Sequence, residues 1–245
     1  MGLSWVRISL IIPVRDEAAY VEPLLEALDR PWRRRWGLEV IAVDGQSRDG
    51  TPDRVRPHVE LLLEQDGQEP PTIAAARNAG ARRARGAILW FLNADVSLPQ
   101  DRDGFLAAVL KALQRHEAAV APVEVWPEEA FWQDRLIMRF LDAYYRLANR
   151  MGLGTGRGEC HFVRRDAFEA VGGYNAALAA GEDFDLLRRL RRRGPIAWLT
   201  GWAVYESPRR YRAWGYSRVL GWWLLNSLSI LLRGRSFSRS WDPVR

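Results

Sequence analysis

Short apolar runs alternate along this chain with segments whose apolar residues recur every three or four positions. Most runs lack a polar alternation, which is typical of strands buried on both faces of a parallel sheet. The intervening segments have the period of helices, because Val21, Leu24, Leu25 and Leu28 would share one face. This alternation predicts a mainly parallel α/β sheet flanked by helices, with right-handed crossovers. The strands predicted in the first half are Ser9–Val14, Glu39–Val43, Val59–Leu63, Ile88–Leu92 and Ala118–Val123.

The predicted helices lie between these strands and continue into the second half of the chain. Asp16 and Thr51 stand where side-chain caps would begin the first two helices, and Pro52 suits a first helical position. Residues 32–36, two tryptophans around three arginines, are interpreted as a solvated turn. The longer predicted helices are Glu17–Leu28, Thr72–Ala84, Asp103–Arg115, Glu128–Arg150 and Leu186–Arg193.

The second half adds three short predicted strands, Cys160–Val163, Ile196–Leu199 and Ala203–Tyr205. The glycines of residues 152–158 neither follow a strand nor fall in GxGxxG order, so they do not indicate a dinucleotide-binding turn. No repeat or low-complexity linker divides the 245 residues. We therefore predict one α/β domain over residues 1–206 and a basic, amphipathic helical extension over residues 207–245.

Acidic residues follow three of the predicted strands. Asp16-Glu17 and Asp44 come after the first two, and the run Ile88–Leu92 stops at Asn93-Ala94-Asp95. In an open α/β sheet, ligands bind beyond the carboxyl ends of the strands. A carboxylate held there is well placed to bind a divalent cation against a phosphate. The alternative is that Asp95 only begins a turn, as aspartate commonly does.

The composition of the chain excludes some classes of protein and favours others. The formal net charge of +6 favours anionic partners, although Lys111 is the only lysine and the arginine excess also fits a skewed base composition. The single cysteine, Cys160, excludes an internal disulfide and a tetrathiolate metal site, and it fits a reducing cytosol. No GxxxxGK[ST] loop is present, which excludes the P-loop ATPases. Met1 leads straight into a predicted strand, so no secretory signal is expected.

Four motifs follow one another along the chain in a characteristic order. They are SLIIPVRDEA, VIAVDGQSRDGT, AARNAGARRARGAILWFLNADV, and GGYN followed by GEDFDLLRRLRRRG. From about Ile8 to Gly194 the chain resembles the family 2 glycosyltransferases, which are inverting enzymes of the GT-A fold. The resemblance implies transfer of a sugar from a nucleotide-diphosphate sugar, with a UDP-sugar preferred, to an acceptor hydroxyl. The acceptor itself is left open; a position at a membrane would favour a lipid or a lipid-linked glycan. It also implies Mn²⁺ or Mg²⁺ on the donor diphosphate.

The resemblance assigns roles to individual residues. Asp95 would ligate the metal and Asp183 would be the general base, while Asn93 replaces the first aspartate of the family's DxD element with a neutral, poorer cation ligand. Glu17 would lie near the ribose, Asp44 would accept a hydrogen bond from the base, and the other residues would line the nucleotide. The implied donor-binding residues are Pro13, Arg15, Glu17, Asp44, Arg77, Asn93, Glu182, Arg209 and Arg210.

The C-terminal run Val219–Leu232 has no charge and stands between Arg218 and Arg233. It is shorter than the roughly 20 apolar residues that span a bilayer. Two interpretations stay open. Trp222 and Trp223 would anchor the run at an anionic membrane surface, or the run packs on its own domain or on a second copy in a homodimer. The first interpretation predicts a cytoplasmic protein that is peripheral at the inner face of the cell membrane.

Two other functions compete with a glycosyltransferase. A nucleotidyltransferase would also use a metal-binding carboxylate on an α/β sheet, but the first loop of this chain is acidic where such an enzyme would have a basic, glycine-rich phosphate loop. A nucleic-acid-binding protein would explain the positive charge, but many arginines fall on ordinary helix faces. The lone His161 is either a metal ligand or a structural residue.

Overall fold

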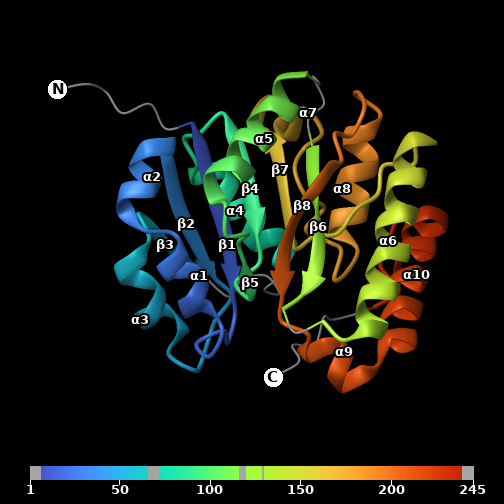
Figure 1. The fold of residues 1–245 in the computed structure, drawn as a ribbon, viewed down its shortest axis with the longest axis horizontal. Helices are drawn as coiled ribbons and strands as arrows, with labels where there is room; N and C mark the ends of the chain where they lie inside the picture. The colour runs from blue at the N-terminus through green and yellow to red at the C-terminus, as the bar shows by residue number, and fades with distance from the viewer. Residues whose placement is uncertain (1–6, 66–71, 116–119, 129, 239–245) are drawn as a thin grey trace.

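The computed structural model describes residues 7–65, 72–115, 120–128 and 130–238. They form an eight-stranded sheet with the order β3-β2-β1-β4-β7-β6-β8-β5 (Figure 1). The strands are β1 (Ile8–Val14), β2 (Leu38–Asp44), β3 (Leu61–Glu64), β4 (Ile88–Leu92), β5 (Val96–Ser97), β6 (Val120–Pro127), β7 (Cys160–Arg164) and β8 (Leu199–Glu206).

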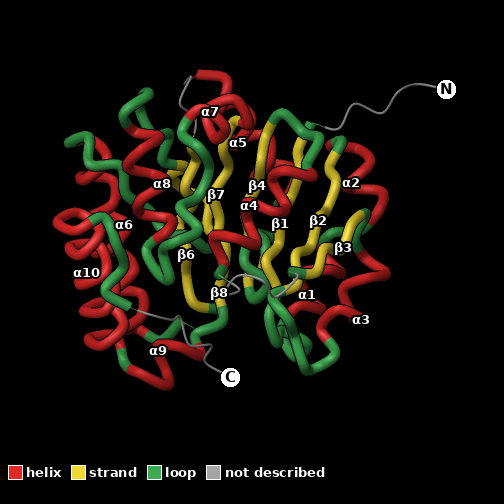
Figure 2. The backbone as a smooth tube through the Cα atoms, turned by 180° about the vertical axis from the view of Figure 1, so that it is seen from behind, coloured by secondary structure: helices red, strands yellow, loops and turns green. Residues whose placement is uncertain are grey.

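Helices cover both faces of this sheet, as the view from behind in Figure 2 also shows. They are α1 (Val21–Ala27), α2 (Arg30–Trp36), α3 (Thr51–Val55), α4 (Ile73–Arg83), α5 (Arg102–Arg115), α6 (Trp132–Arg150), α7 (Arg165–Ala170), α8 (Glu182–Arg191), α9 (Arg209–Trp214) and α10 (Tyr216–Arg233).

The first four strands of the sheet confirm the predicted parallel arrangement. β3, β2, β1 and β4 pair in parallel. β7 then runs antiparallel to both β4 and β6, while β8 is parallel to β6. The sheet is therefore mixed in its second half, which hydrophobic patterning does not predict because a buried strand has the same pattern in either direction.

The buried strands pack on both sides, as their continuous apolar runs predict. In β1, Leu10 and Ile12 belong to a core that contains residues of α1, α2 and α5, whereas Ile11 belongs to a core formed with α4, α7 and α8. All three side chains are almost completely buried. Two packed faces hold β1 rigidly, and β1 in turn holds the loop that follows it.

The predicted caps of the first two helices are wrong. Asp16 lies at φ +54°, and its backbone N–H donates to Ser47 Oγ while its Oδ1 accepts from the Arg48 backbone N–H. Thr51 Oγ1 accepts from the backbone N–H of Glu17 at 2.8 Å. Both side chains therefore tie the loop after β1 to the loop after β2, and α1 begins only at Val21.

The predicted turn at residues 32–36 is also wrong, because residues 30–36 form α2. Asp29 caps it by accepting from the Trp32 backbone N–H at 2.9 Å. Trp32 is buried in the core, and Arg33 is 5% exposed with its Nη1 2.9 Å from Glu60 Oε2. The helix was missed because of its three consecutive arginines. The sequence does not show whether an arginine is buried in an ion pair or solvated.

The two predicted closing strands form one strand. β8 is continuous, and its register against β6 shifts between the Val123–Leu199 and Glu124–Ala203 pairs. The irregular part of the strand contains Gly201 at φ +83°, a conformation that glycine adopts readily. Ile196 lies before the strand. Parts of other predicted segments lie outside the described residues: Met1, residues 118–119 of a predicted strand, residue 129 of a predicted helix and residues 239–245 of the predicted extension.

Beyond the last strand, α9 and α10 pack against α6 at one end of the molecule (Figures 1 and 2). Met138, Tyr145, Tyr211 and Val219 form the centre of this third core. The proposed boundary at residue 206 stays a prediction. Within the described part of the chain, no helix is long and apolar enough to cross a membrane.

Candidate active site

A cavity of about 350 Å³ lies at the edge of the sheet where the parallel strands end. Its wall combines segments that are far apart in the sequence, because parallel strands bring their carboxyl ends to one edge. Residues 93–95 follow β4, and α9 closes the opposite side. Of the predicted site residues, those that line the cavity are Pro13, Arg15, Glu17, Asn93, Asp95, Arg209 and Arg210.

Arg209 joins two carboxylates inside this cavity. Its Nη2 lies 2.7 Å from Glu17 Oε1 and 3.1 Å from Asp95 Oδ2, and its Cζ lies 4.4 Å from the centre of the Tyr20 ring. Burial raises the pKa of both Glu17 and Asp95, and the Arg209 charge acts against this rise. The guanidinium therefore occupies the space between the two carboxylates and compensates their charge.

The residues at the end of β4 could supply only one or two ligands to a cation, so most of its ligands would come from a substrate or from water. In the described residues, no three histidine, cysteine or acidic side chains gather closely enough to hold a metal ion. Asn93 Oδ1 is already taken, since it accepts from Arg77 Nη2 at 2.8 Å. Glu17 Oε2 is buried without a hydrogen-bond partner. One or two carboxylates suit Mg²⁺ or Mn²⁺ when phosphates and water complete the coordination.

Arg77 and Glu182 lie behind the cavity, outside the set of residues that line it. Arg77 is 1% exposed, and its Nη1 lies 2.9 Å from Glu182 Oε1. Its Nη2 also donates to the Gly158 carbonyl at 2.6 Å. This buried cation thus ties the end of β4 to the start of α8, so it positions the cavity wall.

Asp183 stands at the start of α8, directly after this buried pair. A Cβ added at Gly158 would lie 2.9 Å from Asp183 Oδ2, so the carboxylate rests against the Gly158 backbone. Asp183 is not itself a lining residue, but Glu159, the next residue after Gly158, is one. Desolvation and the negative charges of Glu182 and Glu159 raise the pKa of Asp183 to about 7. This carboxyl group can therefore take or release a proton near neutral pH.

Asp44, predicted to meet the nucleobase, lies at the end of β2 beneath the cavity. It is 4% exposed; its Oδ2 accepts from the Ser47 backbone N–H at 3.0 Å, and its Oδ1 is buried with no hydrogen-bond partner. The next residue, Gly45, lines the cavity.

Sequence reasoning missed, among the lining residues, the acidic and aromatic side chains of Glu159, Glu206, Tyr211 and Trp223. The buried Arg157 holds them together, because it pairs with Glu206, donates to the Tyr211 hydroxyl at 2.7 Å and lies 3.2 Å from Glu159 Oε1. Burial raises the pKa of Glu206 to about 7. No local pattern marks these residues, which come from β8, α9, α10 and the loop before β7. The signal that could have found two of them is the charge of Glu159 and Glu206, each next to a predicted strand.

His161 is structural in this fold. It is fully buried in β7, where its Nε2 hydrogen-bonds the Tyr174 hydroxyl and its ring lies 5.3 Å from that of Phe91. Burial, and then the Arg77 charge, lower its pKa well below the usual range. The metal-ligand interpretation is therefore not supported.

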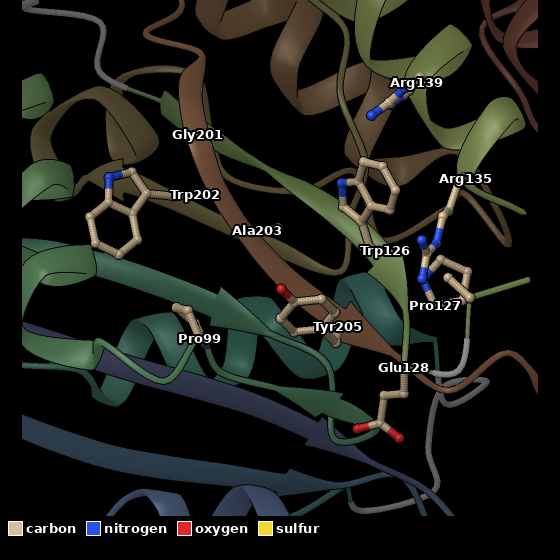
Figure 3. A pocket seen from close by; sticks show the side chains of 11 residues that line it. Pro99, Trp126, Pro127, Glu128, Arg135, Arg139, Gly201, Trp202, Ala203 and Tyr205 are labelled. Atoms are coloured by element: carbon tan, nitrogen blue, oxygen red, sulfur yellow. The ribbon is translucent and has the colours of Figure 1, made fainter. Parts of the chain in front are cut away.

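A second cavity, of about 640 Å³, lies on the other face of β8. Successive residues of a strand point to opposite faces, so Tyr205 lines this cavity while Glu206 lines the first one. Figure 3 shows Trp202 and Tyr205 on β8, with Trp126 on β6 and Arg135 beside it.

A family model described as glycosyl transferase family 2 matches residues 9–172. Among curated relatives, a beta-monoglucosyldiacylglycerol synthase from Nostoc sp. is 25% identical over 261 residues, which covers 97% of this chain and 54% of the relative. Glycosyltransferase AglE from Haloferax volcanii is 36% identical over 96 residues, which covers 37% of this chain and 31% of AglE. The chain thus spans about half, or less, of these relatives.

Solved structures are similar over most of the chain. The mannosyltransferase PcManGT from Pyrobaculum calidifontis, in complex with GDP-Man and Mn²⁺, has a TM-score of 0.69 at 25% identity and covers 93% of this chain and 64% of its own. Glucosyl-3-phosphoglycerate synthase from Mycobacterium tuberculosis, in complex with Mn²⁺, UDP and glucosyl-3-phosphoglycerate, has a TM-score of 0.61 at 20% identity, with coverages of 92% and 78%. The predicted GT-A-type fold is confirmed, and the two competing functions are not favoured.

Proposed function

The chain belongs to glycosyl transferase family 2, and on that basis we propose that it is a metal-dependent, inverting glycosyltransferase. It moves a sugar from a nucleotide-diphosphate sugar to an acceptor hydroxyl. The observation that carries this proposal is the meeting of Glu17, Asp95 and Arg209 in one cavity at the carboxyl edge of the sheet. A cavity with both signs of charge suits a donor that brings a diphosphate together with a cation.

The donor lies along the cavity wall in this proposal. Pro13, Arg15 and Glu17 contact the nucleoside, and the free oxygen of Asp44 accepts from the base. Arg209 and Arg210 contact the diphosphate, since arginine matches phosphate oxygens bidentately. We keep the UDP-sugar as the first donor to test, while GDP-Man and UDP both occur in the similar solved structures.

Asp95 would hold the cation that accompanies the donor diphosphate, and Mn²⁺ and Mg²⁺ are the candidates. A bound cation would stabilise the negative charge that develops on the leaving diphosphate. Arg209 now contacts Asp95 Oδ2 at 3.1 Å, so it would have to release this carboxylate before Asp95 could ligate a cation. The same side chain is then free to contact the phosphates.

Asp183 takes the proton of the acceptor hydroxyl. A single base and a direct displacement at the anomeric carbon invert its configuration, whereas retention would need a nucleophile on the enzyme. A pKa of about 7 matches the task, because a general base works best when its pKa is near the working pH. The Arg77–Glu182 pair positions α8, and with it Asp183, against the cavity wall.

The acceptor is a hydroxyl on a lipid or a glycan. The Nostoc relative is named for a diacylglycerol lipid, which supports the lipid class. Nucleic acid is not expected as a partner, because several arginines are themselves buried and paired with a glutamate, as Arg33 is with Glu60 and Arg77 with Glu182. A location in the cytoplasm, at the inner membrane surface, is proposed with the lipid acceptor.

Thermal-shift measurements with UDP-, GDP- and dTDP-sugars, each with and without Mn²⁺, test the donor. The matching donor raises the melting temperature in the presence of metal, because a ligand that binds only the native state stabilises it by mass action. Asp183→Asn should keep this shift and lose transfer by roughly 10²–10⁴-fold. Asp53→Asn, in the first turn of α3 and exposed, is the matched control. No shift with any donor, or near-normal transfer by Asp183→Asn, contradicts the proposal.

A further inference from the structure

Helices α6 and α10 expose an apolar surface that no described part of the chain covers. Its residues on α6 recur mostly at four-residue spacing and therefore share one side of the helix. We call this surface the α6–α10 face, and its side chains are 43–81% exposed. They are Trp132, Leu136, Phe140, Tyr144 and Leu147 on α6 and Leu224, Leu225, Leu228, Leu231 and Leu232 on α10.

The two helices lie side by side at the end of the molecule, away from β3 (Figures 1 and 2). Their contact is made by other residues, among them Met138 and Leu141 of α6 and Val219 of α10. The exposed residues are therefore surplus to the packing of the domain. Exposed apolar residues at this density are unusual for a surface that meets only water, and they mark an interaction site.

The charge on this face has one sign. Both carboxylates of α6, Asp134 and Asp142, are buried, and α10 contains no acidic residue. Arg135 and Arg139 are exposed on α6, and they also line the second cavity (Figure 3). Further exposed arginines on the two helices are Arg150, Arg218 and Arg233.

Exposed apolar residues together with arginines, and no exposed carboxylate on the two helices, indicate which partner the α6–α10 face binds. A second copy of the chain, packed through the same face, would bring arginines together without exposed carboxylates on these helices to pair with them. An anionic bilayer surface offers phosphates to the arginines and an acyl boundary to the leucines and aromatic rings. Trp132, Phe140 and Tyr144 are residue types suited to that boundary.

The anchors differ from those expected from the sequence. Trp223 is half-buried and lines the donor cavity, with Arg157 Cζ 5.2 Å from its ring, and Trp222 packs edge-on against Phe237. Leucines of α10 and the exposed residues of α6 form the outer surface instead. Helix α10 thus presents leucines to solvent on one side and Trp223 to the donor cavity on another.

We propose that the α6–α10 face docks the protein on the surface of an anionic lipid bilayer. The face inserts its apolar side chains at the boundary between headgroups and acyl chains, while Arg135 and Arg139 contact lipid phosphates. Because α10 also lines the donor cavity, docking brings lipid hydroxyls to the mouth of the site. Only this last step rests on the proposed function; docking itself does not.

Flotation of the full chain with vesicles tests the docking, in the absence of any donor. The wild-type protein should float with phosphatidylcholine vesicles that contain phosphatidylglycerol, and less with phosphatidylcholine alone or in high salt. Leu224→Ser/Leu228→Ser/Leu231→Ser should bind vesicles roughly 10-fold more weakly or worse. Arg135→Gln/Arg139→Gln should weaken binding to the anionic vesicles on the order of 10-fold. The control Arg82→Gln/Arg83→Gln removes two exposed arginines from α4 and should float like the wild type.

Wild-type protein that stays at the bottom of the gradient with anionic vesicles overturns the proposal. So does a leucine variant that floats as well as the wild type. A dimer in light scattering that the leucine variant abolishes, without flotation, would assign the face to a second copy. Donor-induced thermal shifts measured without vesicles keep the two hypotheses apart, since the leucine variant should retain them even where docking is lost.

Discussion

Replacing Asp183 by asparagine should stabilise the protein while it removes the proposed base. The ordinary pKa of an aspartate, 3.8, is raised to about 7 at Asp183 by desolvation and by the charges of Glu182 and Glu159. The folded state therefore disfavours the ionised carboxylate. Asparagine has the same shape and can still accept the hydrogen bond that Asp183 Oδ1 takes from the Phe184 backbone N–H, but it carries no charge.

The size and the sign of the effect follow from linkage. Between about pH 4 and about pH 7 the folded state holds a proton that the unfolded state releases, so the wild type loses stability as the pH rises through this window. A shift from 3.8 to about 7 corresponds to about 4 kcal/mol if it is complete. The side chain is partly exposed, so screening by solvent reduces this to about 1–2 kcal/mol. A chain of this size gains roughly 2–4 °C in melting temperature per kcal/mol.

Thermal melts of both proteins from about pH 5 to about pH 8 measure the difference. Asp183→Asn should melt roughly 2–8 °C above the wild type at the upper end, with the gap closing as the pH falls. Asp53→Asn, an exposed first-turn aspartate, should shift the melting temperature by less than about 2 °C at every pH. A variant that is less stable than the wild type near pH 8, or a gap that does not change with pH, would refute the reasoning.

Three further predictions address the cavity and its support. Arg209→Gln should let the donor-free protein bind Mn²⁺ more tightly, because it vacates the carboxylate at the end of β4; an unchanged affinity in a metal titration contradicts this. Gly158→Ala should reduce transfer while the far-ultraviolet spectrum stays native, since the new methyl group would stand 2.9 Å from Asp183 Oδ2; full activity would argue against the assigned base. Arg77→Met should lower the free energy of unfolding by about 3–5 kcal/mol, because it leaves the Glu182 charge buried, and a loss below about 1 kcal/mol in urea titrations would contradict that.

The sequence by itself determined the strands that present the site. Continuous apolar runs identified β1, β2 and β4, because a strand covered on both faces needs apolar residues at every position. The same pattern located Asn93 and Asp95, which follow directly after such a run. The order of the four motifs was enough to predict the family, which the family model confirms.

Only the tertiary structure decided which charges meet. Arg209 contacts Glu17 across 192 residues, and Arg77 contacts Glu182 across 105. Local patterns report burial and periodicity, but the path of the chain sets which distant side chains become neighbours. For the same reason, the antiparallel direction of β7 and the entry of Trp223 into the cavity could not be predicted from a pattern. Glu17 and Asp95 could be predicted from the sequence, but the presence of Glu159 and Glu206 in the same cavity, and the pairing of its carboxylates with arginines, depend on the fold.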